Sequence, residues 1–141
     1  MSRRSFDMPH VVSFEETNLV GNVYYTNYFS WQGRCRELFL HEHVAQTLAA
    51  LQSGELRLVT AHASCDFADE FVAFDEVLVR MSLNRYIAHG VSLNFEFARV
   101  AKPEEVLARG RQDIKFLQRQ GGSWALCEMP AALADAVRRY E

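Results

Sequence analysis

Features that mark secreted and membrane proteins are scarce in this sequence of 141 residues. It has only three cysteines, which lie far apart and form no C-x-x-C pair. Residues 1–10 carry arginines, but no apolar run follows them, so we expect no secretory leader. The longest stretch without a charge, residues 17–33, contains three asparagines and a glutamine and therefore cannot span a bilayer. We expect a soluble protein of the reducing cytoplasm, with no membrane contact.

A basic surface and the common catalytic motifs are also missing. Lysine and arginine number 15 against 18 acidic residues, and a net charge of -3 argues against nucleic-acid binding. No G-x-S-x-G elbow, H-E-x-x-H helix or glycine-rich phosphate loop occurs, so serine hydrolases, zinc proteases and nucleotide-binding proteins have no local support. The spacing of His41-Glu42-His43 does not suit two ligands on one helical face. We expect neither a metal nor a cofactor.

Length and composition indicate one globular domain over residues 1–141, large enough for a core but too small for two domains. Hydrophobic residues at 49% and charged residues at 23% are ordinary for a folded protein. Residues 1–9 show no periodicity, and we expect a flexible arm there, followed by a short strand over His10–Phe14.

Helical periodicity is confined to the first half of the chain. After a turn at Thr17–Asn22, a helix is predicted from about Tyr28 to Glu42, with Thr26 or Asn27 as its cap. A shorter helix, residues 44–52, ends before a glycine that suits a helix C-terminus.

From Leu56 onward, apolar residues alternate with polar ones, which predicts four long strands and one short strand. Turn residues separate them at positions 74–75, 89–90, 102–103 and 121–122. An antiparallel meander beside one long helix favours an α+β protein in which a curved sheet of five to six strands wraps around that helix, although several α+β sandwiches fit the same pattern. The inward positions expected on the strands are Val59, Ala61, Ala63, Cys65 and Phe67; Val77, Val79, Met81 and Leu83; Val91, Leu93, Phe95 and Phe97; Val106, Ala108, Ile114 and Phe116; and Trp124 and Leu126.

The segment over residues 15–40 is the most specific part of the sequence. It reads E-E-T-N-L-V-G-N-V-Y-Y-T-N-Y-F-S-W-Q-G-R-C-R-E-L-F-L and resembles the signature of the hotdog-fold acyl thioesterases, the 4-hydroxybenzoyl-CoA thioesterase-like group. In that group an acidic residue lies three positions before the glycine that leads into the central helix. Here that position is Asn18, before Gly21. Together with Tyr25, Tyr28 and Arg36, it is most similar to the thioesterases of enediyne polyketide antibiotic biosynthesis, which lack the acidic residue and are associated with an asparagine and an arginine.

Arg36 stands out on the helical wheel because its neighbours are apolar. A guanidinium at the edge of a buried arc needs a partner, since an unpaired interior charge is very costly. The residues alone leave two readings open: an ion pair with Glu15, Glu16 or Asp66, or a functional group. The resemblance favours function.

The resemblance implies a catalytic set of Asn18, Tyr25, Tyr28 and Arg36. A neutral amide cannot serve as nucleophile or general base, so hydrolysis would rest on positioning and electrostatic stabilisation. Asn18 would hold a water through its oxygen or donate to an oxyanion through its nitrogen. The Tyr25 N–H, at the positive end of the helix, is the expected oxyanion donor. The Tyr28 hydroxyl either binds a substrate oxygen or belongs to a core tyrosine.

The resemblance implies a thioesterase that releases a β-keto polyene acyl group from the acyl carrier domain of an iterative polyketide synthase, reached through its phosphopantetheine arm. It also implies a homo-oligomer, either a dimer or a tetramer. The alternatives are a bacterial acyl-CoA thioesterase with another acyl group and a non-catalytic hotdog module that binds acyl thioesters. A row formed by Arg109, Arg111, Lys115 and Arg119 is either a solvated face or a docking surface for an acidic carrier.

Overall fold

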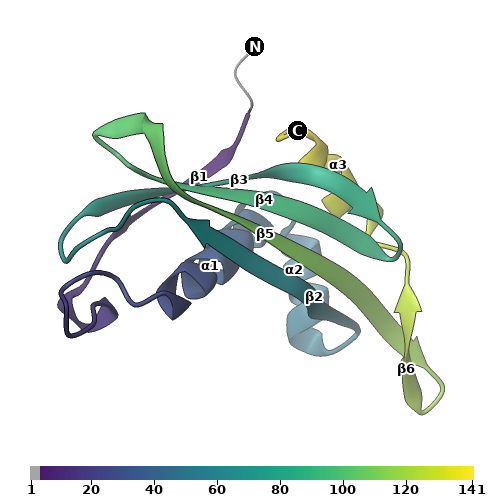
Figure 1. The fold of residues 1–141 in the computed structure, drawn as a ribbon. Coiled ribbons are helices and arrows are strands. Elements are labelled where there is room, and N and C mark those ends of the chain that lie inside the picture. The colour runs from purple at the N-terminus through teal and green to yellow at the C-terminus, as the bar shows by residue number, and fades with distance from the viewer. Residues whose placement is uncertain (1–3) are drawn as a thin grey trace.

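The computed structural model describes residues 4–141 and shows a curved six-stranded antiparallel sheet with helix α1 lying along its concave face (Figure 1). The strands follow the order β1-β3-β4-β5-β2, and β6 pairs with β5 beyond the point where β4 ends. This is the α+β hotdog fold expected from the sequence. In chain order the elements are β1 (Phe6–Val11), the 3₁₀ turn η1 (Phe14–Glu16), α1 (Thr26–His43), α2 (Ala45–Ser53), β2 (Leu56–Phe67), β3 (Glu76–Ile87), β4 (Gly90–Arg99), β5 (Lys102–Gln120), β6 (Ser123–Cys127) and α3 (Ala131–Arg138).

The prediction of a flexible arm over residues 1–9 is wrong from Phe6 onward. Residues 6–11 form β1, which pairs with β3, and the strand expected at His10–Phe14 therefore begins four residues earlier. Phe6 and Met8 are buried, and the Phe6 ring meets that of Phe39 edge-on at 5.4 Å. Pro9 is tolerated because β1 is an outer strand of the sheet. Residues 1–3 of the expected arm lie outside the described residues.

The strands after α2 match the predicted ones. Along β2, however, the side chains that face the core switch from even-numbered to odd-numbered positions. The register of β2 with β5 shifts between Thr60 and His62, as at a bulge. Leu56 and Leu58 pack against the core before the shift, and Cys65 does so after it. Val59 and Ala61, which strict alternation placed inside, are consequently exposed. Three further positions expected inside are also exposed: Ala63, Phe67 and Leu126. The turn expected at residues 102–103 lies at residues 100–101, and β5 begins at Lys102.

Helix α1 begins at Thr26 and presents buried Trp31, Cys35 and Phe39 to the sheet. Neither Thr26 nor Asn27 caps the helix as predicted. Asn27 instead donates through Nδ2 to the Glu16 carbonyl at 2.8 Å. The last helix, α3, was not predicted; beyond it, the Tyr140 carbonyl accepts from the backbone of β3. None of the helices within residues 4–141 is long and apolar enough to cross a membrane.

Candidate functional site

The turn before α1 holds Asn18 by its side-chain oxygen. Asn18 Oδ1 accepts from the Val20 backbone N–H at 2.9 Å, and the Asn18 carbonyl accepts from Gly21 at the same distance. Gly21 has a φ of 92°, a conformation that favours glycine. Asn18 Nδ2 has no hydrogen-bond acceptor within the described part of the chain. The amide therefore offers its nitrogen, rather than its oxygen, to a ligand.

A buried carboxylate fixes this turn against α1. Glu16 is only 9% exposed and accepts from the Ser13 backbone N–H at 2.9 Å and from Trp31 Nε1 at 2.7 Å. His10 Nε2 lies 2.8 Å from the same carboxylate. Burial raises the pKa of Glu16, but the hydrogen bonds from Ser13, His10 and Trp31 outweigh it, and the net pKa lies below its usual value. The network sets where Asn18 stands relative to the helix.

The entry of α1 supplies the expected backbone donor. Tyr25 precedes the first helical residue, and its N–H has no acceptor among residues 4–141. Such groups at a helix start carry the positive end of the dipole. The Tyr25 side chain is 55% exposed, with its ring 5.0 Å from that of Tyr24. Tyr25 thus supplies a backbone donor that has no acceptor among residues 4–141, at the entry of the helix.

Tyr28 is a core tyrosine by packing, and it also reaches a cavity. It is 3% exposed, and its ring meets those of Phe67 at 4.8 Å and Phe97 at 5.3 Å. Burial raises the pKa of its hydroxyl to about 12, so the group stays protonated and can donate at neutral pH. Tyr28, Tyr25 and Asn18 line one cavity of about 270 Å³. The structure thus brings three of the four predicted residues together.

Arg36 lies elsewhere, and it forms none of the ion pairs considered as alternatives. Its Nη1 donates to Gln112 Oε1 at 2.7 Å and makes a long contact of 3.5 Å with Thr60 Oγ1. Its Nε is buried and has no acceptor in the described chain. Burial lowers the pKa of the guanidinium, while Glu37 acts in the opposite direction; an arginine nevertheless remains charged at neutral pH. Arg36 is thus a cation without an ion pair among the described residues, and it lines a cavity.

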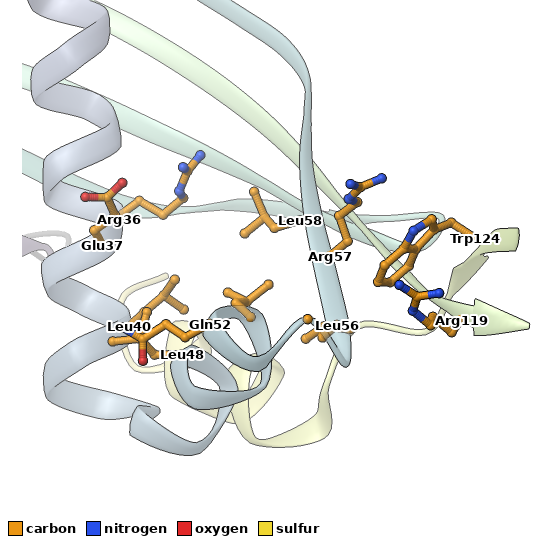
Figure 2. A pocket seen from close by; sticks show the side chains of 12 residues that line it. Arg36, Glu37, Leu40, Leu48, Gln52, Leu56, Arg57, Leu58, Arg119 and Trp124 are labelled. Atoms are coloured by element: carbon orange, nitrogen blue, oxygen red, sulfur yellow. The ribbon is translucent and has the colours of Figure 1, made fainter. Parts of the chain in front are cut away.

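That cavity is a groove of about 810 Å³ between α1, α2 and the first residues of β2 (Figure 2). Arg36 and Glu37 line its α1 side. On the opposite side, the indole of Trp124 has the guanidinium carbons of Arg57 and Arg119 at 4.8 and 5.1 Å from its ring centroid. We call this space the leucine groove, because its apolar lining consists mainly of Leu40, Leu48, Leu51, Leu56 and Leu58.

The four predicted residues therefore occupy two places in one chain. Tyr28 and Arg36 are eight positions apart on α1, which corresponds to about 12 Å along the helix axis, and they line different cavities. Sequence reasoning missed Gln112. Its signal was a polar side chain at an inward position of β5, among Gly110, Ile114 and Phe116.

The predicted row of cations on β5 is not a continuous free surface. Arg109 pairs with Glu96, and Arg111 lies 3.4 Å from Asp113. Arg119 stacks on Trp124 instead. The first two charges are thus largely offset by carboxylates.

Comparison with known proteins agrees with this architecture. The thioesterase-like superfamily matches residues 12–137. The solved structure of the dynemicin thioesterase, described with induced-fit and allosteric effects upon polyene binding, is similar over 96% of both chains, with 46% identity and a TM-score of 0.89. Among curated protein sequences, none matches this chain significantly.

Two more distant structures share the fold. A 1,4-dihydroxy-2-naphthoyl-CoA thioesterase from Synechocystis is similar over 95% of this chain and 96% of its own, with 19% identity and a TM-score of 0.83. A gentisyl-coenzyme A thioesterase is similar over 94% and 98%, with 23% identity and a TM-score of 0.76. The chain belongs to the thioesterase-like hotdog superfamily and is a thioester hydrolase.

Proposed function

We propose that this enzyme hydrolyses a β-keto polyene acyl thioester carried by the acyl carrier domain of an iterative polyketide synthase in enediyne biosynthesis. The likeness to the dynemicin thioesterase, an enediyne enzyme whose structure was described with polyene binding, supports this substrate class. The leucine groove offers a long apolar surface for a conjugated chain. The free thiols of Cys35, Cys65 and Cys127 support a reducing compartment such as the cytoplasm.

One observation carries the proposal: Arg36 lines the groove, and its charge is held by neutral partners rather than by a carboxylate among residues 4–141. A charged donor that faces a carbonyl oxygen stabilises the negative charge that develops there during hydrolysis. The charge of Arg36 is not offset by a carboxylate, because Arg36 forms no ion pair among residues 4–141.

The proposed hydrolysis needs no general base from the protein. Water attacks the thioester carbon, whose electrophilicity is raised by the neighbouring β-keto group, and the carbonyl oxygen becomes an oxyanion. Arg36, Asn18 Nδ2 and the Tyr25 N–H donate to the substrate oxygens. The carbon–sulfur bond then breaks, the carbonyl re-forms as a carboxylic acid, and the sulfur leaves as a thiolate that takes up a proton from the attacking water.

We place the complete site between two copies of the chain. Asn18 and Arg36 line separate cavities of one chain. Strand β2 ends the main sheet, so its outer edge is unpaired within residues 4–141, and natural proteins cover such edges. Leu19 and Val20, beside Asn18, are 107% and 84% exposed, an apolar tip suited to contact with another subunit.

The direct test is to incubate the protein with a loaded polyketide synthase and to identify the released acid by mass spectrometry. A β-keto polyene acid, or its decarboxylated ketone, is expected. Turnover of acyl-CoA esters with no release from the carrier would instead identify an acyl-CoA thioesterase with another acyl group.

A further inference from the structure

Gln112 is a buried polar residue on the otherwise apolar inward face of β5. It is 5% exposed and pairs in register with Leu93 of β4 and Ala63 of β2. A buried amide is costly unless it is hydrogen-bonded. Its Oε1 meets this requirement through Arg36 Nη1 at 2.7 Å. The contact joins the centre of the sheet to the functional side chain of α1.

This contact restricts the whole guanidinium. The group is planar, so an acceptor that fixes Nη1 also restricts the direction of Nε. Arg36 Nε is left buried and without an acceptor among residues 4–141. Gln112 thus uses one donor of Arg36 and leaves another unused.

The chemical type of the partner matters as much as its position. A carboxylate at this place would form a strong bidentate ion pair and offset the charge of Arg36. An amide oxygen accepts the same hydrogen bond but carries no net charge. The full positive charge of Arg36 therefore remains available to a substrate oxygen.

A second buried amide supports the same part of α1. Gln32, one turn before Arg36, is completely buried and donates through Nε2 to the Ser64 carbonyl at 3.2 Å. It occupies the space beside Gly110, where an added Cβ would lie 2.2 Å from Gln32 Nε2. The helix backbone that carries Arg36 is thereby held close to β2 and β5.

We propose that Gln112 is a positioning residue that orients Arg36 toward the substrate while leaving its charge unneutralised. The inference rests on the proposed role of Arg36 and assigns to Gln112 a role of its own in the reaction. It explains why a glutamine, rather than an apolar or an acidic residue, lies at the centre of the inward face.

The decisive variant is Gln112→Glu, which keeps the size of the side chain and its hydrogen bond but adds a charge. A purely structural role predicts a variant that is as stable and as active as the parent. If Gln112 positions Arg36 without neutralising its charge, Gln112→Glu should have an unchanged or higher melting temperature. Its kcat at pH 7 should fall about 10-fold or more. Gln118→Glu, on the same strand but exposed, is the matched control and should behave as the parent.

A second variant keeps the test decisive if Gln112→Glu does not fold. Gln112→Asn retains the amide but is too short to hold Arg36 in place, and a misplaced group can lower kcat by about 10²-fold. A Gln112→Asn variant with parental kcat would overturn the proposal.

A binding measurement separates this inference from the proposed function. The probe is the non-hydrolysable amide analogue of 3-oxododecanoyl-N-acetylcysteamine, titrated by calorimetry. Gln112→Glu should weaken its binding about 10-fold, the scale of a charge-assisted hydrogen bond to a carbonyl, even if no natural thioester has been found. Equal affinity in the parent and in Gln112→Glu would overturn the role of Gln112. Turnover of no acyl thioester by the parent would overturn only the proposed function.

Discussion

Trp31 Nε1 of α1 donates to the Glu16 carboxylate across 2.7 Å, in a part of the protein where both side chains are buried. The bond joins the central helix to the turn that carries Asn18. The turn that carries Asn18 is therefore anchored by a charged group in the interior. The stability of this anchor and its pH dependence can both be measured.

Glu16→Gln should destabilise the protein by roughly 1.5–3 kcal/mol at pH 7, the range for a hydrogen bond to a charged group. The folded-state pKa of Glu16 is lowered, so its contribution is present above the pKa of the unfolded chain and is lost as pH falls through the folded pKa. Urea unfolding at pH 7 and in mild acid measures how much unfolding free energy is lost on acidification. This loss should be smaller in Glu16→Gln than in the parent. Glu15→Gln, an exposed neighbour, is the control. An identical decrease in unfolding free energy on acidification in the parent and in Glu16→Gln would contradict this role.

Asn18→Asp should lose activity at almost unchanged stability. The aspartate keeps the oxygen that accepts from Val20, but it removes the free Nδ2 donor and places a negative charge beside the developing oxyanion. Asn18→Ala should lose activity and also about 1 kcal/mol of stability with the turn contact. Steady-state kinetics and thermal melting separate the two effects. A gain of activity in Asn18→Asp would instead indicate general-base catalysis.

Trp124→Ala should shift the chain-length preference if the acyl chain occupies the leucine groove. The indole and its two flanking arginines line the side of the groove opposite α1. Its removal makes room for about two further methylene groups at roughly 0.8 kcal/mol each, or about a 10-fold gain in kcat/KM for longer chains relative to shorter ones. A series of acyl-N-acetylcysteamine thioesters measures this ratio. Leu126→Ala, on the same strand and half exposed, should leave the ratio unchanged.

The outer edge of β2, which is unpaired within residues 4–141, predicts self-association. Light scattering should give at least twice the 16.2 kDa of one chain, because an exposed strand edge is normally covered. Ala61→Arg, at the bulge of this edge strand, should shift the protein toward monomers and lower its activity in parallel. Ala101→Arg, in the exposed turn between β4 and β5, is the control. A fully active monomer would contradict a site shared between two chains.

Much of the fold could be predicted because period-two and helical patterns are strong from Tyr28 onward. The bulge in β2 could not, since a single added residue reverses the phase without leaving a signal in the sequence. Strand β1 was missed because Asp7 and Pro9 alternate with Phe6 and Met8, and a proline reads as a break unless the strand is known to lie at an edge.

The site was predictable only in part. The helical wheel identified Arg36 as a cation among apolar neighbours, but its partner lies 76 positions away, and no local pattern indicates that contact. The grouping of Asn18, Tyr25 and Tyr28 follows from a turn that folds back on its own helix, which short-range reasoning can predict. The distance of Arg36 from that group also follows from the helix rise. That the two lie in separate cavities could be known only from the structure.

We propose that Arg36 stabilises charge on the substrate without the help of a catalytic carboxylate. The most direct test of this role is the steady-state hydrolysis of 3-oxododecanoyl-N-acetylcysteamine by Arg36→Ala beside Arg34→Ala, an exposed arginine on the same helix. We expect folded Arg36→Ala to lose about 10²-fold or more in kcat, the scale for one oxyanion donor. Arg34→Ala should be unaffected. An unchanged kcat in folded Arg36→Ala would contradict this role.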